Sequence, residues 1–146
     1  MAAMKFAHSL CCLERPARFL SPSDALHGGL GFVQKGDIVV LISKGGFTSE
    51  LNPILDISKK RGAVIITVTE NPNSYLALNS DIMLHAYTKK EVGKNNILYT
   101  SSFLVTVAIL DALTCALMDL LGFDISSFSE IHPGGAVGKK LANIKP

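Results

Sequence analysis

The sequence predicts an α/β fold of the doubly wound type, with a mostly parallel sheet covered by helices on both faces. Residues 37–43 and 63–69 are short apolar runs rich in β-branched side chains, and each is bounded by glycine or turn residues. Such runs are typical of buried parallel strands. Between them, residues 49–61 carry apolar side chains at helical spacing. Strands that alternate with helices indicate right-handed crossovers and a parallel sheet.

The other elements follow the same alternation. We expect helices at residues 3–14 and 75–78, a short helix capped by Ser21 or Ser23 that stops at Gly28 and Gly29, and a long helix from about Thr100 to Leu121. With Ser21 as the cap, Pro22 takes the first helical position. Residues 17–20 and 81–86 are further strand candidates, and residues 89–96 form a polar loop.

Length and composition indicate one domain spanning residues 1–146, with 48% hydrophobic and 18% charged residues. The net charge of +2 and the scattered Lys and Arg residues predict no nucleic-acid partner. Three cysteines without metal-ligand spacing predict neither a metal nor a cofactor. No signal peptide is recognisable, so we expect a cytoplasmic location.

Residues 97–123 have the length and apolar composition of a membrane-spanning helix. Asp111 and Asp119 interrupt this run, and a charged carboxylate is costly inside a bilayer. We therefore expect a helix packed within protein, across a subunit interface.

The first candidate site follows the first buried strand, because ligands of such sheets bind beyond the carboxyl ends of the strands. The loop contains Ser43, Lys44, Gly45, Gly46 and Thr48 before the next helix. Glycines allow close backbone approach, the helix N-terminus attracts anions, and the hydroxyls and the ammonium add donors. An ordinary strand-to-helix turn with a hydroxyl cap explains the local pattern equally well.

Four segments carry a resemblance to the sugar isomerase (SIS) domain family, and to its arabinose 5-phosphate isomerase branch. Residues 42–50 (ISKGGFTSE) resemble the family's phosphate loop, and residues 19–31 resemble its His-Gly-Asp-Leu-Gly segment. Residues 89–102 resemble its Lys-Glu loop running into Thr-Ser-Ser, and residues 131–141 its His-Pro-Gly-Gly-Ala segment. The resemblance implies a phosphosugar-binding domain that assembles as a dimer or tetramer.

The sequence departs from the family pattern at several positions. Lys44 stands where the isomerases commonly have Asn, Gly45 replaces their second Ser, and Gly29 replaces the Asp of the His-Gly-Asp segment. Residues 92–96 replace a stretch that shapes the sugar pocket, which leaves the sugar undefined. The family's first strand and its glycine-rich lysine loop have no counterpart before Met1, and no CBS domains follow Pro146. We therefore expect an N-terminally truncated domain with little isomerase activity of its own.

Aldose–ketose isomerisation moves a proton between C1 and C2 and needs a base and a polariser of the carbonyl oxygen. The resemblance implies that Glu91, His132, His27 and Glu50 are the catalytic candidates, with Glu91 as the proton-shuttling carboxylate and Glu50 in a supporting role. Three have a structural alternative: Glu50 in a helix's first turn, Glu91 as a solvated loop charge, and His27 at a helix end. His132 precedes Pro133-Gly134-Gly135 in an exposed-looking loop, where a functional role is favoured over a structural one.

The leading function is therefore a sugar-phosphate isomerase acting on arabinose 5-phosphate or ribulose 5-phosphate. The alternative from another class is a non-catalytic phosphosugar-sensing domain, which the Gly45 change favours. An unrelated flavodoxin-like domain is a third interpretation, but it would need an aromatic flavin pocket in a chain with no Trp.

Overall fold

The computed structural model describes residues 1–142, which fall into two compact units. The larger unit is Phe19–Ile109 together with Ala2, and it contains all the strands of the described chain. The smaller unit comprises Ala3–Arg18 and the chain from Leu110 onward, with Met1. A long helix, α5 (Ser101–Leu121), begins in the larger unit and ends in the smaller one.

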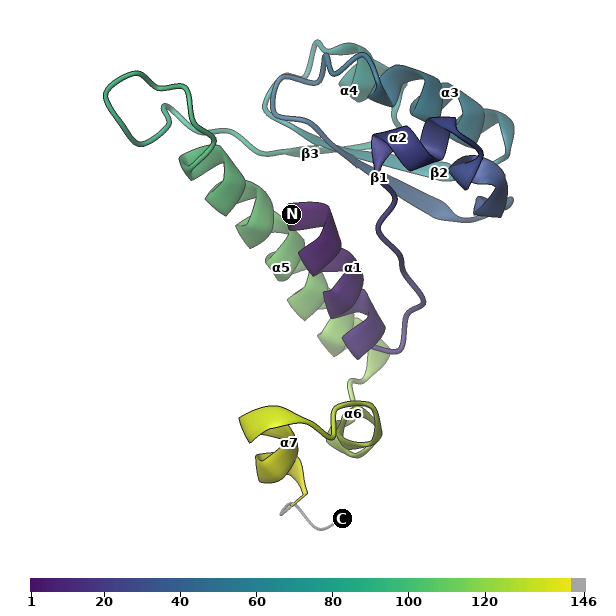
Figure 1. Cartoon of the computed structure of the whole chain (residues 1–146), viewed down its shortest axis with the longest axis vertical. Helices are drawn as coiled ribbons and strands as arrows, with labels where there is room; N and C mark the ends of the chain where they lie inside the picture. The colour runs from purple at the N-terminus through teal and green to yellow at the C-terminus, as the bar shows by residue number, and fades with distance from the viewer. Residues whose placement is uncertain (143–146) are drawn as a thin grey trace. The chain divides into compact units, whose positions relative to one another are not determined.

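The larger unit is built on a parallel sheet of three strands in the order β1-β2-β3 (Figure 1). The strands are β1 (Ile38–Ile42), β2 (Val64–Thr69) and β3 (Ile82–His85). Ile38 pairs with Val64, and Ile66 pairs with Ile82. Because all three strands run in the same direction, their carboxyl ends lie at one edge of the sheet.

One face of this sheet carries the core and its covering helices (Figure 1). These are α2 (Pro22–Leu26), the 3-10 helix η1 (Gly29–Phe32), α3 (Leu51–Lys60) and α4 (Tyr75–Asn79). Alternation along the strands turns Leu41 and Ile65 toward α3, where they pack with Ile54, Leu55 and other apolar side chains. The amphipathic face expected of residues 49–61 is therefore the face that fills the core.

The opposite face of the sheet is partly uncovered within the larger unit. Ile38, Val64 and Ile82 lie at the amino ends of their strands on this face, and their side chains are 63%, 39% and 48% exposed. Val68, near the carboxyl end of β2, is buried on the same face. The apolar character of these strands on both faces is what a parallel sheet predicts.

The smaller unit is helical. It contains α1 (Ala2–Cys12), the second half of α5, α6 (Ile125–Ile131) and α7 (Gly135–Leu141). An ion pair between Lys5 and Asp111 joins α1 to α5. Asp124 caps α6 by accepting the Ser127 amide N–H at 3.0 Å.

The α/β class, the parallel sheet and most predicted elements are confirmed. Ser21 caps α2, with Pro22 at the first helical position, and the left-handed φ of 103° at Gly28 follows the helix end. The strand expected at residues 17–20 is wrong. Those residues adopt no regular structure, because a strand forms only by pairing and they pair with none of the three strands of the described sheet.

Helix α5 meets the length and hydropathy requirements of a membrane-spanning helix, with a mean hydropathy of 2.1. Only 6% of its most apolar window is buried within the chain. Asp111 and Asp119 both fall within the residue range of this helix, as the sequence predicts. Length and hydropathy alone are weak evidence for a membrane span, because core helices of water-soluble proteins satisfy the same requirements.

Candidate functional site

The predicted anion loop lies at the carboxyl end of β1 and leads into α3. Two hydroxyls close it: the Ser43 and Thr48 side-chain oxygens are 2.8 Å apart. The Gly46 amide N–H points inward and donates to the Ser43 hydroxyl at 3.1 Å. Two contacts to the neighbouring strand fix its outer edge, because the Lys44 carbonyl accepts from the Glu70 amide and from the Thr69 hydroxyl.

Gly46 is required by this geometry. Its φ of +69° lies in the left-handed region, and a β-carbon there would stand 2.1 Å from the Ser74 hydroxyl oxygen. Gly45 differs, because its backbone angle is ordinary and nothing lies within 4 Å of the position of a β-carbon. The two adjacent glycines therefore have different roles: Gly46 allows the turn, and Gly45 leaves the loop open.

The loop keeps donors available for an anion. The amide N–H groups of Gly45, Phe47, Thr48 and Ser49 donate to no group in the described part of the chain, whereas that of Gly46 is used internally. Three of these groups directly precede α3, where the helix dipole adds positive potential. Four N–H groups of the loop are thus unengaged and one is not, and anion binding at this loop stays a prediction.

Lys44 does not extend freely into solvent. Its ammonium donates to a Glu91 carboxylate oxygen at 2.8 Å and lies 4.0 Å from a Glu70 carboxylate oxygen. Its side chain remains 40% exposed. The hydrogen bond to Glu91 raises the pKa of Lys44, so the ammonium stays charged.

Glu91 is buried, with a side chain only 2% exposed. Besides Lys44, its carboxylate accepts the Thr100 and Ser102 amide N–H groups at 2.8 and 3.1 Å and the Thr100 hydroxyl at 3.2 Å. These bonds satisfy free donors at the N-terminus of α5. The Lys44 ammonium, followed by the bonds from Ser102 and Thr100, holds the pKa of Glu91 well below its ordinary value of 4.5. The alternative of a solvated loop charge is therefore wrong.

Glu50 and His27 are exposed side chains of the larger unit. Glu50 sits at the N-cap of α3, where its side chain makes no capping hydrogen bond, and His27 is the C-cap residue of α2. The glycine that departs from the family pattern, Gly29, has a packing reason. A β-carbon there would lie 2.5 Å from the Asp24 carbonyl oxygen, so the backbone here has no room for an aspartate side chain.

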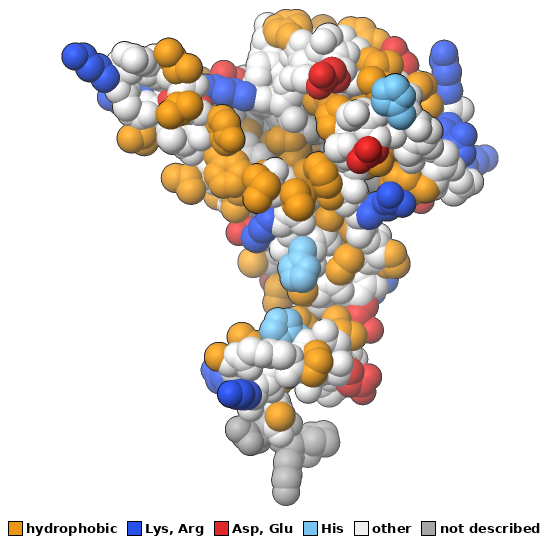
Figure 2. Space-filling model, viewed as in Figure 1, with side chains coloured by type: hydrophobic (Ala, Val, Ile, Leu, Met, Phe, Trp, Pro, Cys, Tyr) orange, Lys and Arg blue, Asp and Glu red, His pale blue; other side chains and the backbone are white. Residues whose placement is uncertain are grey.

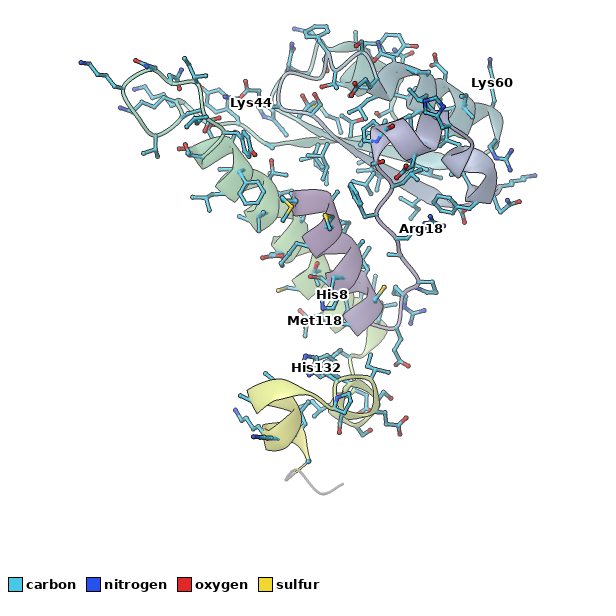
Figure 3. The ribbon with its side chains drawn as sticks, in the orientation of Figure 1. His8, Arg18, Lys44, Lys60, Met118 and His132 are labelled. Carbon is cyan, nitrogen blue, oxygen red and sulfur yellow. The ribbon has the colours of Figure 1, made fainter. Side chains whose placement is uncertain are left out.

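His132 belongs to the smaller unit, as the C-cap residue of α6 (Figure 3). Its ring packs on Phe128 with the centroids 5.0 Å apart, and its Nδ1 atom is buried without a hydrogen-bond partner in the described chain. The larger unit brings Ser43, Lys44, Thr48 and Glu91 into a cluster of two hydrogen-bonded pairs. Ser43 pairs with Thr48 and Lys44 pairs with Glu91, and the two pairs adjoin where Ser43 precedes Lys44 in the chain. Glu50 adjoins this cluster along the chain.

Sequence reasoning missed two participants in this cluster. Glu70 directly follows β2, and Thr100 directly precedes α5. The position of Glu70 was a usable signal, because a residue just after a parallel strand lies at the same edge as the loop after its neighbour. The described residues contain no cluster of His, Cys, Asp or Glu side chains suited to a metal ion.

Comparison with known proteins gives concordant results. Residues 1–116 match the SIS domain model. A probable arabinose 5-phosphate isomerase of Haemophilus influenzae is 42% identical over 126 residues, which cover 86% of this chain and 37% of that protein. A solved putative sugar-phosphate isomerase from Listeria monocytogenes superposes with a TM-score of 0.89 at 47% identity, covering 91% of this chain and 70% of that one.

A further solved structure, from Escherichia coli CFT073, is a complex with a sugar phosphate. It superposes with a TM-score of 0.86 at 32% identity, covering 90% of this chain and 70% of that one. The chain spans less than half the length of the curated relatives that it matches, 37% of the Haemophilus protein and 42% of a Pseudomonas aeruginosa arabinose 5-phosphate isomerase. On the family match and these relatives, this chain belongs to the SIS domain family.

Proposed function

We propose that the protein is a sugar-phosphate isomerase that interconverts arabinose 5-phosphate and ribulose 5-phosphate. The observation that carries this proposal is the loop after β1, which combines four unengaged amide N–H groups, two hydroxyls, an ammonium and an unobstructed glycine, Gly45. Such a set suits the three acceptor oxygens of a phosphate. Relatives named as arabinose 5-phosphate isomerases support this choice of sugar.

The phosphate group anchors the substrate, and the chemistry takes place at the other end of the sugar. A base must take the C2 proton of the aldose and an acid must return a proton to C1, so that an enediol forms and collapses to the ketose. A group that carries this proton needs a free lone pair. We assign the transfer to Glu50, whose exposed carboxylate makes no capping bond, and ring opening and oxygen polarisation to His27.

A phosphosugar-sensing domain is the second candidate. One observation favours it: Glu91, the carboxylate that the resemblance implies as the proton carrier, already accepts four hydrogen bonds and is held ionised. A sensor would keep the phosphate loop and need no acid–base group. Both candidates share the ligand class, so binding alone does not separate them.

The experiment measures binding and turnover together. Arabinose 5-phosphate is titrated calorimetrically into residues 1–146, and its conversion to ribulose 5-phosphate is followed for this chain. A second protein, extended at the N-terminus with a relative's first strand and lysine loop, is assayed in parallel. Conversion by either protein supports the isomerase. Binding without conversion by both supports the sensor, and absence of binding contradicts both proposals.

The proposed assembly is a homo-oligomer in the cytoplasm. Apolar side chains on α5 support it, since Leu104 and Leu120 are 66% and 80% exposed. Figure 2 shows hydrophobic side chains over the first turns of α5 and the loop that precedes it. A second subunit would cover such a surface.

A further inference from the structure

Glu91 and Lys44 form a unit whose arrangement does not suit proton transfer. The carboxylate is almost completely buried and accepts from Lys44, Thr100 and Ser102, so its oxygens are committed to four hydrogen bonds. A carboxylate that must alternately gain and lose a proton needs at least one oxygen directed at the substrate. Here both oxygens accept hydrogen bonds from groups of the protein. The role of Glu91 is therefore to position the groups that donate to it.

The carboxylate holds two separate segments. One oxygen accepts from Lys44 in the loop after β1, and the other accepts from the Thr100 and Ser102 amides at the N-terminus of α5. Lys44 and Glu91 are 47 residues apart in the chain, so this ion pair is a tertiary contact within the larger unit. A buried carboxylate of this kind retains its counter-ion, because an uncompensated buried charge is strongly destabilising.

Lys44 keeps donor capacity while it is held. An ammonium has three N–H donors. One is given to Glu91, whereas the nearest Glu70 oxygen lies at 4.0 Å, beyond hydrogen-bond distance. The side chain is 40% exposed and starts from the residue next to Gly45, the open glycine of the loop. An ammonium fixed by one partner loses less conformational freedom when it binds an anion than a freely rotating one does.

We propose that Lys44 is a specificity-determining residue that binds the phosphate group of the ligand, and that Glu91 is the positioning residue that holds the Lys44 ammonium at the loop. The proposal rests on the proposed function only for the identity of the sugar. The ligand class it requires is a phosphate monoester dianion. Glu91 acts through Lys44 and through the start of α5, and it carries no proton during turnover.

The test is a double-mutant cycle on the complete chain, measured by calorimetry with three probes: arabinose 5-phosphate, inorganic phosphate and arabinose. The variants are Lys44→Met, Lys44→Arg, Glu91→Gln and the double variant Lys44→Met/Glu91→Gln. Glutamine keeps an acceptor for the α5 amides but removes the charge that holds Lys44. Lys94→Met is the matched control, because Lys94 is an exposed lysine in the loop that contains Glu91.

We expect Lys44→Met to raise the Kd of arabinose 5-phosphate and of inorganic phosphate by roughly ten- to a hundredfold, as loss of one hydrogen bond to a charged group does. Arabinose binding should not change. Glu91→Gln should raise the Kd of both phosphate ligands by a comparable factor. The double variant should bind these two ligands no more weakly than Lys44→Met alone. Lys44→Arg should retain most of the affinity, and Lys94→Met should bind like the unchanged chain.

Turnover adds an independent readout. A positioning role predicts that Glu91→Gln raises KM while kcat stays within a few-fold. An unchanged Kd with a kcat reduced by about a hundredfold or more would make Glu91 a proton carrier, overturning this inference while the isomerase proposal stands. Tighter phosphate binding by Glu91→Gln would also overturn it, because the carboxylate would then compete with the ligand for Lys44.

The two proposals fail in different ways. The unchanged chain could bind inorganic phosphate but not arabinose 5-phosphate. If Lys44→Met and Glu91→Gln then bind inorganic phosphate more weakly by comparable factors, the roles of Lys44 and Glu91 are supported and the proposed sugar is contradicted. Equal phosphate affinity of Lys44→Met and the unchanged chain would refute the role of Lys44 whatever the sugar. If Lys44→Met or Glu91→Gln fails to fold, because each leaves one charge of the pair without its partner, the double variant removes both charges and still tests the phosphate contact against Lys44→Arg.

Discussion

Gly46 approaches Ser74 so closely that a β-carbon on residue 46 would lie 2.1 Å from the Ser74 hydroxyl oxygen. Ser74 is completely buried and itself caps α4, accepting from the Ala77 amide and donating to the Asn71 carbonyl. The contact therefore joins the loop after β1 to the turn after β2. Of the two glycines in the loop after β1, only Gly46 is restricted in this way, so this contact limits the shape of the loop.

Gly46→Ala should destabilise the protein by about 2 kcal/mol or more, because the new β-carbon meets a fixed side chain and the backbone keeps a positive φ. Gly45→Ala is the matched control. Its β-carbon meets nothing within 4 Å and its backbone is unstrained, so its effect should be within about 0.5 kcal/mol. Urea denaturation of the two variants measures the difference, and equal midpoints would contradict this explanation of the adjacent glycines.

Thr48→Ala should weaken binding of a sugar phosphate and leave binding of the unphosphorylated sugar unaffected. The Thr48 hydroxyl lies 2.8 Å from that of Ser43, so its loss removes one donor and frees the other. Loss of a hydrogen bond to a charged group corresponds to roughly tenfold or more in Kd. Calorimetric titration with arabinose 5-phosphate and with arabinose tests this, and equal losses for the two ligands would place Thr48 at the sugar rather than at the phosphate.

The elements of the larger unit were predictable because their signals are local. The β-branched runs define β1 and β2, and Ser21 with Pro22 defines the start of α2. The failed strand at residues 17–20 shows the limit of such signals. Four residues become a strand only where a neighbouring edge pairs with them, and pairing depends on the whole sheet.

The loop of the candidate site was predictable, but the partners of its residues were not. Glycines and hydroxyls after a buried strand indicate an anion loop from sequence. That Lys44 reaches a carboxylate 47 residues away depends on how residues 87–100 fold back, and these carry no regular pattern. Whether a loop glutamate is solvated or buried is decided by such tertiary contacts, which is why the solvated alternative for Glu91 failed.

Glu91 should make stability depend on pH in the acid range. Its pKa is lowered by folding from 4.5, so the stabilisation is complete well above that value, where the group is ionised in both states. Below it the unfolded chain takes up the proton first, and the stabilisation declines as the pH falls. The gap in urea midpoint between the unchanged chain and Glu91→Gln should therefore narrow from about pH 7 to about pH 3. A gap that is constant over this range would show that the charge does not contribute.

The exposed apolar side chains of α5 predict self-association. Leu104 is 66% exposed on a largely apolar helix. Covering its side chain removes apolar surface from water, which favours association. Light scattering should give at least twice the chain mass of 15.6 kDa. Leu104→Glu should shift this mass toward the monomer, whereas Lys94→Glu, which changes an exposed loop residue, should not. A monomer at high protein concentration would contradict the proposed assembly.

Glu50→Gln should abolish most of the turnover and leave substrate binding intact. Glu50 makes no capping hydrogen bond at the start of α3, so the amide should fold like the acid. Removing an acid–base group typically costs about 10²–10⁴ in rate, and this loss should appear in kcat while the Kd for arabinose 5-phosphate stays within a few-fold. Asp56→Asn, an exposed change on the same helix, is the control and should retain full turnover. The assay uses whichever protein, the chain or its extended form, interconverts the two sugars. Full kcat in Glu50→Gln would move the proton transfer to His27, and the kcat of His27→Asn would then test that assignment.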